Sequence, residues 1–247
     1  MRVLGRLGAL LTALAAGVLL TLACSNPAPG EPKKPNPTAI LRQAGQSTGT
    51  LRSLKADVKF GPGVTLQGFT LSSATSTLQA PDQSDTTFKV KQGDFLVDVR
   101  VVSIGGHVYL RLPFSRFQEL TPDEMAEVPD LGKLLDSRTG LGALLAEGRD
   151  PAYQGSENVR GAACDKVTAT YTAEQIGRLF GGAAPQGDVR ATVWAGQSDH
   201  FVHRVVLSGP LLEAGKDVEV QVDLHDFNQP VTIASPSTGP VSSPTGG

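Results

Sequence analysis

The 247-residue sequence is poor in aromatic residues, in charge and in cysteine. Aromatic residues make up only 5% of it, which argues against sites for sugars or single-stranded nucleic acids, because such sites depend on stacked rings. Charged residues make up 19%, the formal net charge is −2, and no basic run extends beyond Lys33-Lys34. A protein that binds the phosphate backbone needs a dense positive patch, so we expect no nucleic-acid partner.

The sequence also lacks the short motifs of common catalytic sites. It has no G-K-[ST] phosphate loop, and its G-x-S-x-G match, 45–49 (GQSTG), falls in a segment expected to be helical and not at the strand-to-helix elbow that a nucleophilic serine needs. The segment from Gly140 to Leu145 lacks the third glycine of a dinucleotide loop. His200 and His203 fall on a turn and a strand, where residues three apart point to opposite faces. Cys164 stands just before an alternating strand, so we interpret it as a structural thiol. We therefore expect that the protein is not an enzyme and that it holds neither a metal ion nor a cofactor.

The N-terminus has the pattern of an export signal. Arg2 and Arg6 precede 17 uncharged residues, 7–23, which are mostly Leu, Ala, Val, Gly and Thr. The run ends in Ala23-Cys24 and resembles the bacterial lipobox, although Thr21 stands where leucine is usual. That resemblance implies a lipoprotein signal peptide over 1–23 and a Cys24 that carries a diacylglycerol thioether. The alternatives are a plain cleaved signal and an uncleaved anchor.

Composition divides the rest of the chain into three parts. Five of the 13 residues in 25–37 are proline, so we expect 24–37 to hold the lipidated cysteine and an extended tether. Residues 235–247 are rich in Ser, Pro, Gly and Thr, and we expect a disordered tail there. The folded body is then a single domain over 38–234. With Cys24 lipidated, Cys164 has no thiol partner within the chain, and the core must hold the fold.

The first half of the body is typical of an antiparallel meander. A helix is expected from Thr38, as its cap, to about Leu51. After it come runs of alternating apolar and polar residues separated by turns such as Gly61-Pro62-Gly63 and Gly105-Gly106. The expected strands are 54–60, 64–78, 86–91, 95–102 and 107–112.

The second half mixes helices and strands. Thr121-Pro122 is typical of a capped helix start, and leucines recur at helical spacing from Leu131 to Leu145. A short helix is expected over 173–180, and the remaining strands are expected at 152–158, 165–172, 188–197, 201–208 and 217–227. The pattern thus predicts an α+β fold with about ten one-sided antiparallel strands, which must curl to bury their apolar face. An incomplete barrel with helices inside the curl would bury that apolar face.

An exported, tethered protein without catalytic residues most often binds something, and aliphatic concave positions suit alkyl chains. Burying each CH₂ gains about 0.8 kcal/mol. The same periodicity fits a solid core equally well, so the pattern does not distinguish a hollow interior from a filled one.

Several segments resemble the mycobacterial-type LppX/LprA/LprF/LprG lipoprotein family, with a more distant likeness to carriers of the LolA/LolB type. They include 105–113 (GGHVYLRLP), 138–145 (RTGLGALL), 161–168 (GAACDKVT), Val193-Trp194 with 201–205 (FVHRV), and 226–232 (DFNQPVT). The resemblance implies a U-shaped antiparallel half-barrel with helices on its concave face. It also implies a large apolar cavity between sheet and helices that holds acylated lipids or glycolipids.

The family has no short binding signature, so the cavity candidates come from alternation and helical spacing. Each is as compatible with ordinary core packing as with ligand contact. They are Phe95, Val97, Val99, Val101, Val218, Val220, Val222 and Leu224 from strands, and Leu134, Leu141, Leu144, Leu145, Ile176 and Phe180 from helices.

The sequence therefore favours an envelope lipoprotein, anchored by Cys24 to the outer face of the cytoplasmic membrane, that carries acylated lipids or glycolipids between membrane layers. Its expected partners are the lipid ligand, the membrane and, as a further candidate, a lipid exporter. The first alternative is an envelope adaptor or sensor that binds a protein partner and has a solid core. A second is an exported hydrolase whose site has no familiar motif.

Overall fold

The structure is a computed structural model that describes residues 35–66, 68–125, 131–179, 185–213 and 216–238. Residues 35–247 form a compact unit separate from residues 1–34. The predicted lipidation site Cys24 and the cavity candidate Phe180 lie outside the described residues.

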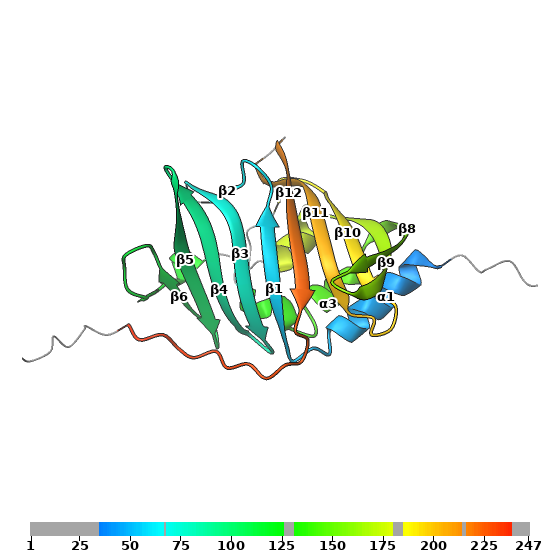
Figure 1. The fold of residues 1–247 in the computed structure, drawn as a ribbon, viewed down its shortest axis with the longest axis horizontal. Helices are drawn as coiled ribbons and strands as arrows, with labels where there is room; N and C mark the ends of the chain where they lie inside the picture. Colours follow the sequence, from blue (N-terminus) through cyan, green and yellow to red (C-terminus); the bar gives the residue numbers. More distant parts are fainter. Residues whose placement is uncertain (1–34, 67, 126–130, 180–184, 214–215, 239–247) are drawn as a thin grey trace, which may run out of the picture. The chain divides into compact units, whose positions relative to one another are not determined.

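One large antiparallel sheet forms the body (Figure 1). Within the described residues it has twelve strands in the order β7-β6-β5-β4-β3-β1-β12-β11-β10-β9-β8, with β2 paired to β3. The strands are β1 (Ser53–Phe60), β2 (Thr65–Leu66), β3 (Phe69–Gln79), β4 (Gln83–Gln92), β5 (Phe95–Ile104), β6 (His107–Arg111), β7 (Gln118–Glu119), β8 (Arg149–Val159), β9 (Ala162–Tyr171), β10 (Val189–Gly196), β11 (Val202–Glu213) and β12 (Lys216–His225).

The sheet consists of two meanders that meet in the middle. Strands β3 to β7 extend from one side of β1, and β8 to β12 extend in reverse order from the other. The two halves join where β1 pairs with β12, in a register that sets Val58 opposite Val222. Because β7 and β8 are the two edges, the sheet described here is unclosed. The sheet is also curved. This agrees with the predicted α+β half-barrel.

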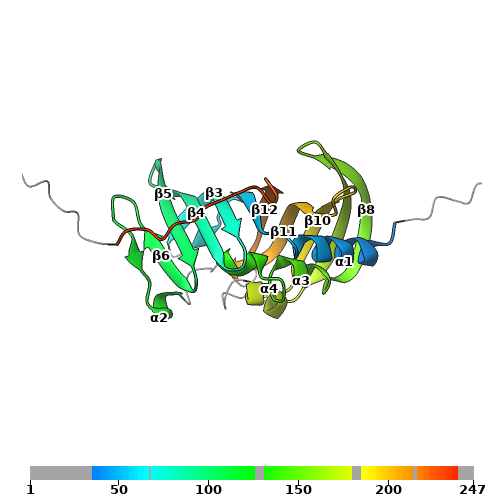
Figure 2. The ribbon, with the colours of Figure 1, turned by 90° about the horizontal axis from the view of Figure 1, so that it is seen from below.

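The chain must cross the sheet to pass from β7 at one edge to β8 at the other. The crossing segment carries α2 (Pro122–Met125), the 3-10 helix η1 (Leu131–Leu135) and α3 (Leu141–Leu145). Helix α1 (Pro37–Thr48) packs on α3, and α4 (Ala173–Leu179) lies between β9 and β10 in the sequence. Figure 2 shows α1, α3 and α4 along one face of the sheet.

Local hydrogen bonds explain where these helices begin. Asn36, not the expected Thr38, caps α1, because its side-chain oxygen accepts from the Ala39 amide at 3.2 Å and Pro37 takes the first helical position. At the start of α4 the Thr172 amide donates to the Gln175 side chain at 2.7 Å. The Gln175 amide donates back to the Thr172 hydroxyl at 3.2 Å, which completes a capping box.

The structure differs from the expected elements in three places. The expected strand 64–78 is two strands, because Gly68 has φ 81° and turns β2 back onto β3. The polar two-residue strand β7 was not predicted, and β2 and β7 account for the count of twelve. The helices of the crossing segment are short, since η1 and α3 have five residues each.

Candidate functional site

The central strands β1 and β12 present one aliphatic face to the helices. Side chains alternate along a strand, and directly paired residues point to the same side. The register therefore places Ala56 beside Leu224 and Phe60 beside Val220. This face continues onto the flanking strands β3, β4, β10 and β11.

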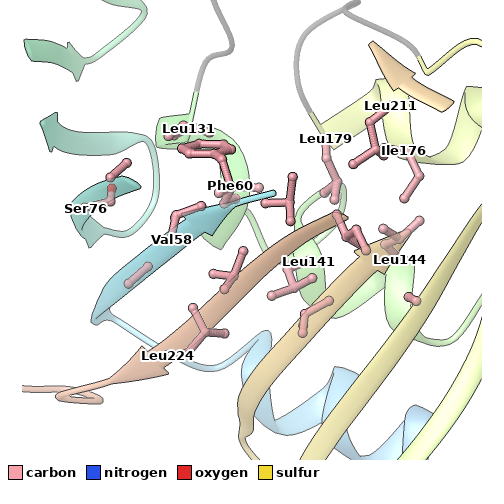
Figure 3. Close-up of a pocket in the computed structure, with 18 of the residues that line it drawn as sticks. Val58, Phe60, Ser76, Leu131, Leu141, Leu144, Ile176, Leu179, Leu211 and Leu224 are labelled. Atoms are coloured by element: carbon pink, nitrogen blue, oxygen red, sulfur yellow. The ribbon is translucent and has the colours of Figure 1, made fainter. Parts of the chain in front are cut away.

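Between this face and the helices lies a cavity of about 370 Å³ (Figure 3). Its volume falls within the range of about 300–1,000 Å³ that is typical of small-molecule sites. Val58 and Val222 are paired at the middle of the sheet, yet both are only half-buried. The reason is that the cavity, rather than packed side chains, lies over them. The sequence pattern fitted a filled and a hollow interior equally well, and the structure has a hollow one.

The cavity wall is almost entirely hydrocarbon, and its few polar atoms are hydroxyls. No charged residue is among the described residues that line it. The hydroxyls of Ser76 and Thr86, paired across β3 and β4, lie 2.7 Å apart and hydrogen-bond each other. The wall therefore offers dispersion contacts and a small hydroxyl pair, but no acid, base or nucleophile for catalysis.

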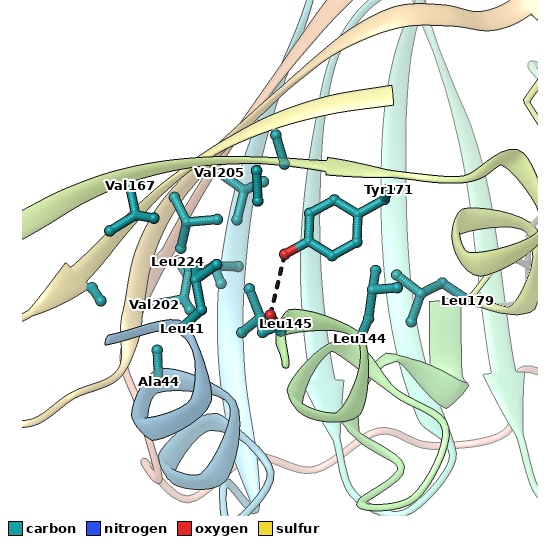
Figure 4. Close-up of a cluster of buried hydrophobic side chains, with 14 of the residues drawn as sticks. Leu41, Ala44, Leu144, Leu145, Val167, Tyr171, Leu179, Val202, Val205 and Leu224 are labelled. Carbon is teal, nitrogen blue, oxygen red and sulfur yellow. Dashed lines mark hydrogen bonds between the residues drawn. The ribbon is translucent and has the colours of Figure 1, made fainter. Parts of the chain in front are cut away.

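The Tyr171 hydroxyl fixes helix α3 to strand β9 beside the cavity (Figure 4). It donates to the Leu145 carbonyl at 3.3 Å, and burial raises the pKa of Tyr171, so the hydroxyl stays neutral. Around this bond lies the main buried core. It includes Leu41 and Ala44 from α1, Leu144 and Leu145 from α3, Leu179 from α4, and Val167, Val202, Val205 and Leu224 from the sheet.

Nine of the fourteen cavity candidates line the cavity. Four come from β12 and the rest from the helices that cover the sheet, so the structure brings together residues far apart in sequence. They are Val218, Val220, Val222, Leu224, Leu134, Leu141, Leu144, Leu145 and Ile176.

The four candidates from β5 do not line the cavity. Val99 and Val101 are paired with Phe88 and Thr86, which do line it, so they point to the same face. The cavity wall nevertheless ends at β4, and Val97 and Val99 pack with Val90 in an apolar cluster that adjoins the wall through Phe88 and Leu71. Phe95 stands at the β4–β5 hairpin and is 76% exposed. The alternation identified the face, but it did not reveal how far along the sheet the cavity extends.

The sequence reasoning missed much of the wall that the sheet contributes. It named no residue of β1, whose clean alternation was the available signal, and none of β3, β10 or β11. The missed lining residues of these strands are Leu54, Ala56, Val58, Phe60, Leu71, Ala74, Ser76, Leu78, Ala191, Val193, Val205, Leu207 and Leu211.

Titratable residues outside the cavity form structural pairs. His203 lies 3.0 Å from Asp199, and His225 lies 3.2 Å from both Asp57 and Asp226. No group of three or more His, Cys, Asp or Glu suited to a metal occurs in the described part of the chain.

Cys164 is completely buried among Val159 and Trp194. Burial raises the pKa of its thiol to about 11, so the thiolate that a nucleophile needs is scarce at neutral pH.

Helices able to cross a bilayer are absent from the segments that the structure describes.

The cavity, the half-barrel and the crossing helices invite comparison with known proteins. The family model of the LppX_LprAFG lipoproteins matches residues 36–233, which cover every described strand and helix. The chain belongs to this family. The lipoarabinomannan carrier protein LprG of Mycolicibacterium hassiacum is 25% identical over 252 residues, covering 94% of this chain and 98% of that protein. Lipoprotein LprA of Mycobacterium tuberculosis is 30% identical over 146 residues, 56% of each chain.

Solved structures of the family share the fold. LprF from Mycobacterium bovis superposes with a TM-score of 0.64 at 23% identity, covering 81% of this chain and 96% of that one. LppX from Mycobacterium tuberculosis gives a TM-score of 0.57 at 24% identity, covering 80% and 97%. At these identities the likeness concerns the fold, and the cavity of this chain is described from its own residues.

Proposed function

We propose that this protein is an envelope lipoprotein that binds acylated lipids or glycolipids in its cavity and carries them between membrane layers. The observation that supports this most is the hollow, uncharged wall over β1 and β12. Such a wall offers nothing to a polar metabolite and excludes water from a hydrocarbon chain. The name of the related LprG, a lipoarabinomannan carrier protein, agrees with a lipid-linked glycan as ligand.

The free energy of transfer favours this ligand class. Each buried CH₂ gains about 0.8 kcal/mol, so a 16-carbon chain gains roughly 12 kcal/mol before the costs of ordering it. A lipid with several acyl chains needs such shelter to leave a bilayer. The aliphatic wall supplies it without groups that would hydrolyse an ester.

Cys24 is the proposed anchor. Diacylation of its thiol would give the two-chain hold that a stable membrane attachment requires. The proline-rich residues 25–35, which precede the cap of α1, would span up to about 34 Å at roughly 3.1 Å per residue, enough to let the body move over the outer face of the cytoplasmic membrane. A lipid exporter in that membrane is the proposed donor of the ligand.

Native mass spectrometry of the full-length protein, purified gently from a lipid-producing host, tests this function. We expect additional masses that match bound acylated lipids and that disappear on organic extraction. An apo mass alone, with a co-purified protein partner, would instead support the adaptor role.

A further inference from the structure

The exposed large hydrophobic side chains of the described residues gather on two neighbouring strands. They are Phe95, Leu96, Leu112 and Phe114. The first two begin β5, and the other two follow the end of β6, whose last residue Arg111 pairs with Arg100 in the middle of β5. Both pairs therefore lie in the half of the β5–β6 hairpin away from its turn. Strands β5 and β6 lie together near one side of the sheet (Figure 1). We refer to these four exposed side chains together as the apolar corner.

Phe114 is held outward by a strained turn. Its φ is 59°, in the left-handed region that bulky residues avoid, and its side chain is 101% exposed. The Ser115 amide and hydroxyl both donate to the Leu112 carbonyl, at 3.1 and 2.9 Å, which fixes the turn. Phe117 folds back to within 5.1 Å of the Arg111 guanidinium. The loop thus buries one phenylalanine against a cation and presents the other to its surroundings.

The outward position of the Phe114 side chain has no explanation within the described part of the chain. A left-handed conformation costs a non-glycine residue of order 1–3 kcal/mol, and such strain gathers at functional positions. The other non-glycine residues with positive φ are Asp150, Arg160, His200, Asp226 and Asn228, all of them polar. A phenylalanine at such a position, with no burial in return, indicates a contact made outside this body.

The charges around the corner favour an anionic surface. Lys91 is exposed on β4 and Arg116 is exposed in the loop after β6. On β5, Asp98 forms a salt bridge with Lys89 at 2.7 Å, so Asp94 is the acid left at the hairpin. The three cations Lys91, Arg111 and Arg116 therefore outnumber Asp94 at the β4–β5 hairpin and in the loop after β6.

We infer that the corner formed by Phe95, Leu96, Leu112 and Phe114 docks the body onto the headgroup region of an anionic lipid membrane. Separate protruding side chains suit a soft interface better than a protein partner, whose contact needs a continuous area of about 800 Å² on each side. Aromatic side chains are stable at the membrane–water boundary, and each nearby Lys or Arg adds attraction to anionic lipid. The inference does not depend on the cavity ligand, because it concerns a different surface.

The test places a reporter at the corner of the full-length protein. Phe114→Trp is compared with Ala152→Trp, an exposed position on β8 at the opposite edge of the sheet. Both proteins are reconstituted in vesicles of equimolar phosphatidylcholine and phosphatidylglycerol that contain brominated acyl chains. We expect a blue shift and strong quenching for the tryptophan at 114, and neither for the one at 152. Neutralising Lys91 or Arg116 to Gln should weaken docking about fivefold each.

Two results would overturn the inference. One is equal quenching at positions 114 and 152, which would mean that the corner has no preference for the bilayer. The other is a blue shift at 114 that rises with protein concentration in the absence of brominated-lipid quenching, which would identify a contact between copies of the chain. Circular dichroism of each variant, compared with the unchanged protein, ensures that the fold is intact in every sample.

Discussion

Gly142 of α3 lies against Gly45 of α1 so closely that a Cβ on Gly142 would stand 2.6 Å from the Gly45 carbonyl oxygen. The reverse contact is at least as tight, because a Cβ on Gly45 would overlap the Gly142 carbonyl oxygen. The two helices therefore cross backbone to backbone beside the core under the cavity. Only glycine at both positions permits this approach.

Gly142→Ala should therefore destabilise the body. The added methyl would meet backbone atoms that cannot rotate away, and overpacking of this kind costs about 1–3 kcal/mol. Chemical denaturation measures the loss. Ala146→Ser, at the exposed end of the same helix, is the matched control and should change the stability by less than about 0.5 kcal/mol. Equal stability of the Gly142 variant and the control would contradict the close crossing.

Tyr171→Phe should lower the free energy of unfolding by about 1 kcal/mol, because it removes the hydroxyl that donates to the Leu145 carbonyl and leaves that carbonyl without its buried donor. Thermal unfolding of the variant, set against Tyr109→Phe on β6, measures this. A loss no greater than that of the Tyr109 variant would show that the bond between α3 and β9 contributes nothing.

Asp223 predicts a pH dependence of stability. This carboxylate is nearly buried, which by itself raises its pKa, but hydrogen bonds from Arg204 and Gln221 outweigh burial and hold the pKa below its usual range. A lowered pKa in the folded state stabilises the protein at pH above the unfolded value of about 4, and this contribution is lost as pH falls through the folded pKa.

Asp223→Asn should thus cost about 1.5–3 kcal/mol at pH 7. The difference from the unchanged protein should shrink below about pH 4, where the native carboxylate also takes up a proton. Urea denaturation over a pH series measures both. A difference that stays constant from neutral to acid pH would contradict the assigned pKa. Asp94→Asn, at the exposed β4–β5 hairpin, is the control for the loss of one carboxylate from the surface.

Local patterns predicted most strands, because each hairpin of the meander is encoded by alternation and a nearby turn. What they could not predict depends on long-range pairing. The β1–β12 pairing joins residues 160 to 170 positions apart, and it creates the central wall of the cavity. Sequence alternation placed Val97, Val99 and Val101 on the correct face, but only the path of the crossing helices determines that the hollow ends at β4.

The close helix crossing was equally hidden. The sequence pattern of Gly140 and Gly142 excludes a dinucleotide loop but gives no sign of a helix crossing, because the neighbours of Gly142, which are Gly45 and Gly49, lie almost a hundred residues away at the end of α1. The polar strand β7 has no apolar alternation to reveal it.

The most direct test of the central claim fills the cavity from its middle. Val222→Trp places an indole over the hollow, whereas Val206→Trp on β11 places one on the opposite face, because its neighbours Val205 and Leu207 point into the cavity. Native mass spectrometry of the two full-length variants gives the fraction of protein that carries acylated lipid. The account predicts a large loss of bound lipid in the Val222 variant and unchanged loading in the Val206 variant. Equal loading of both variants would contradict it.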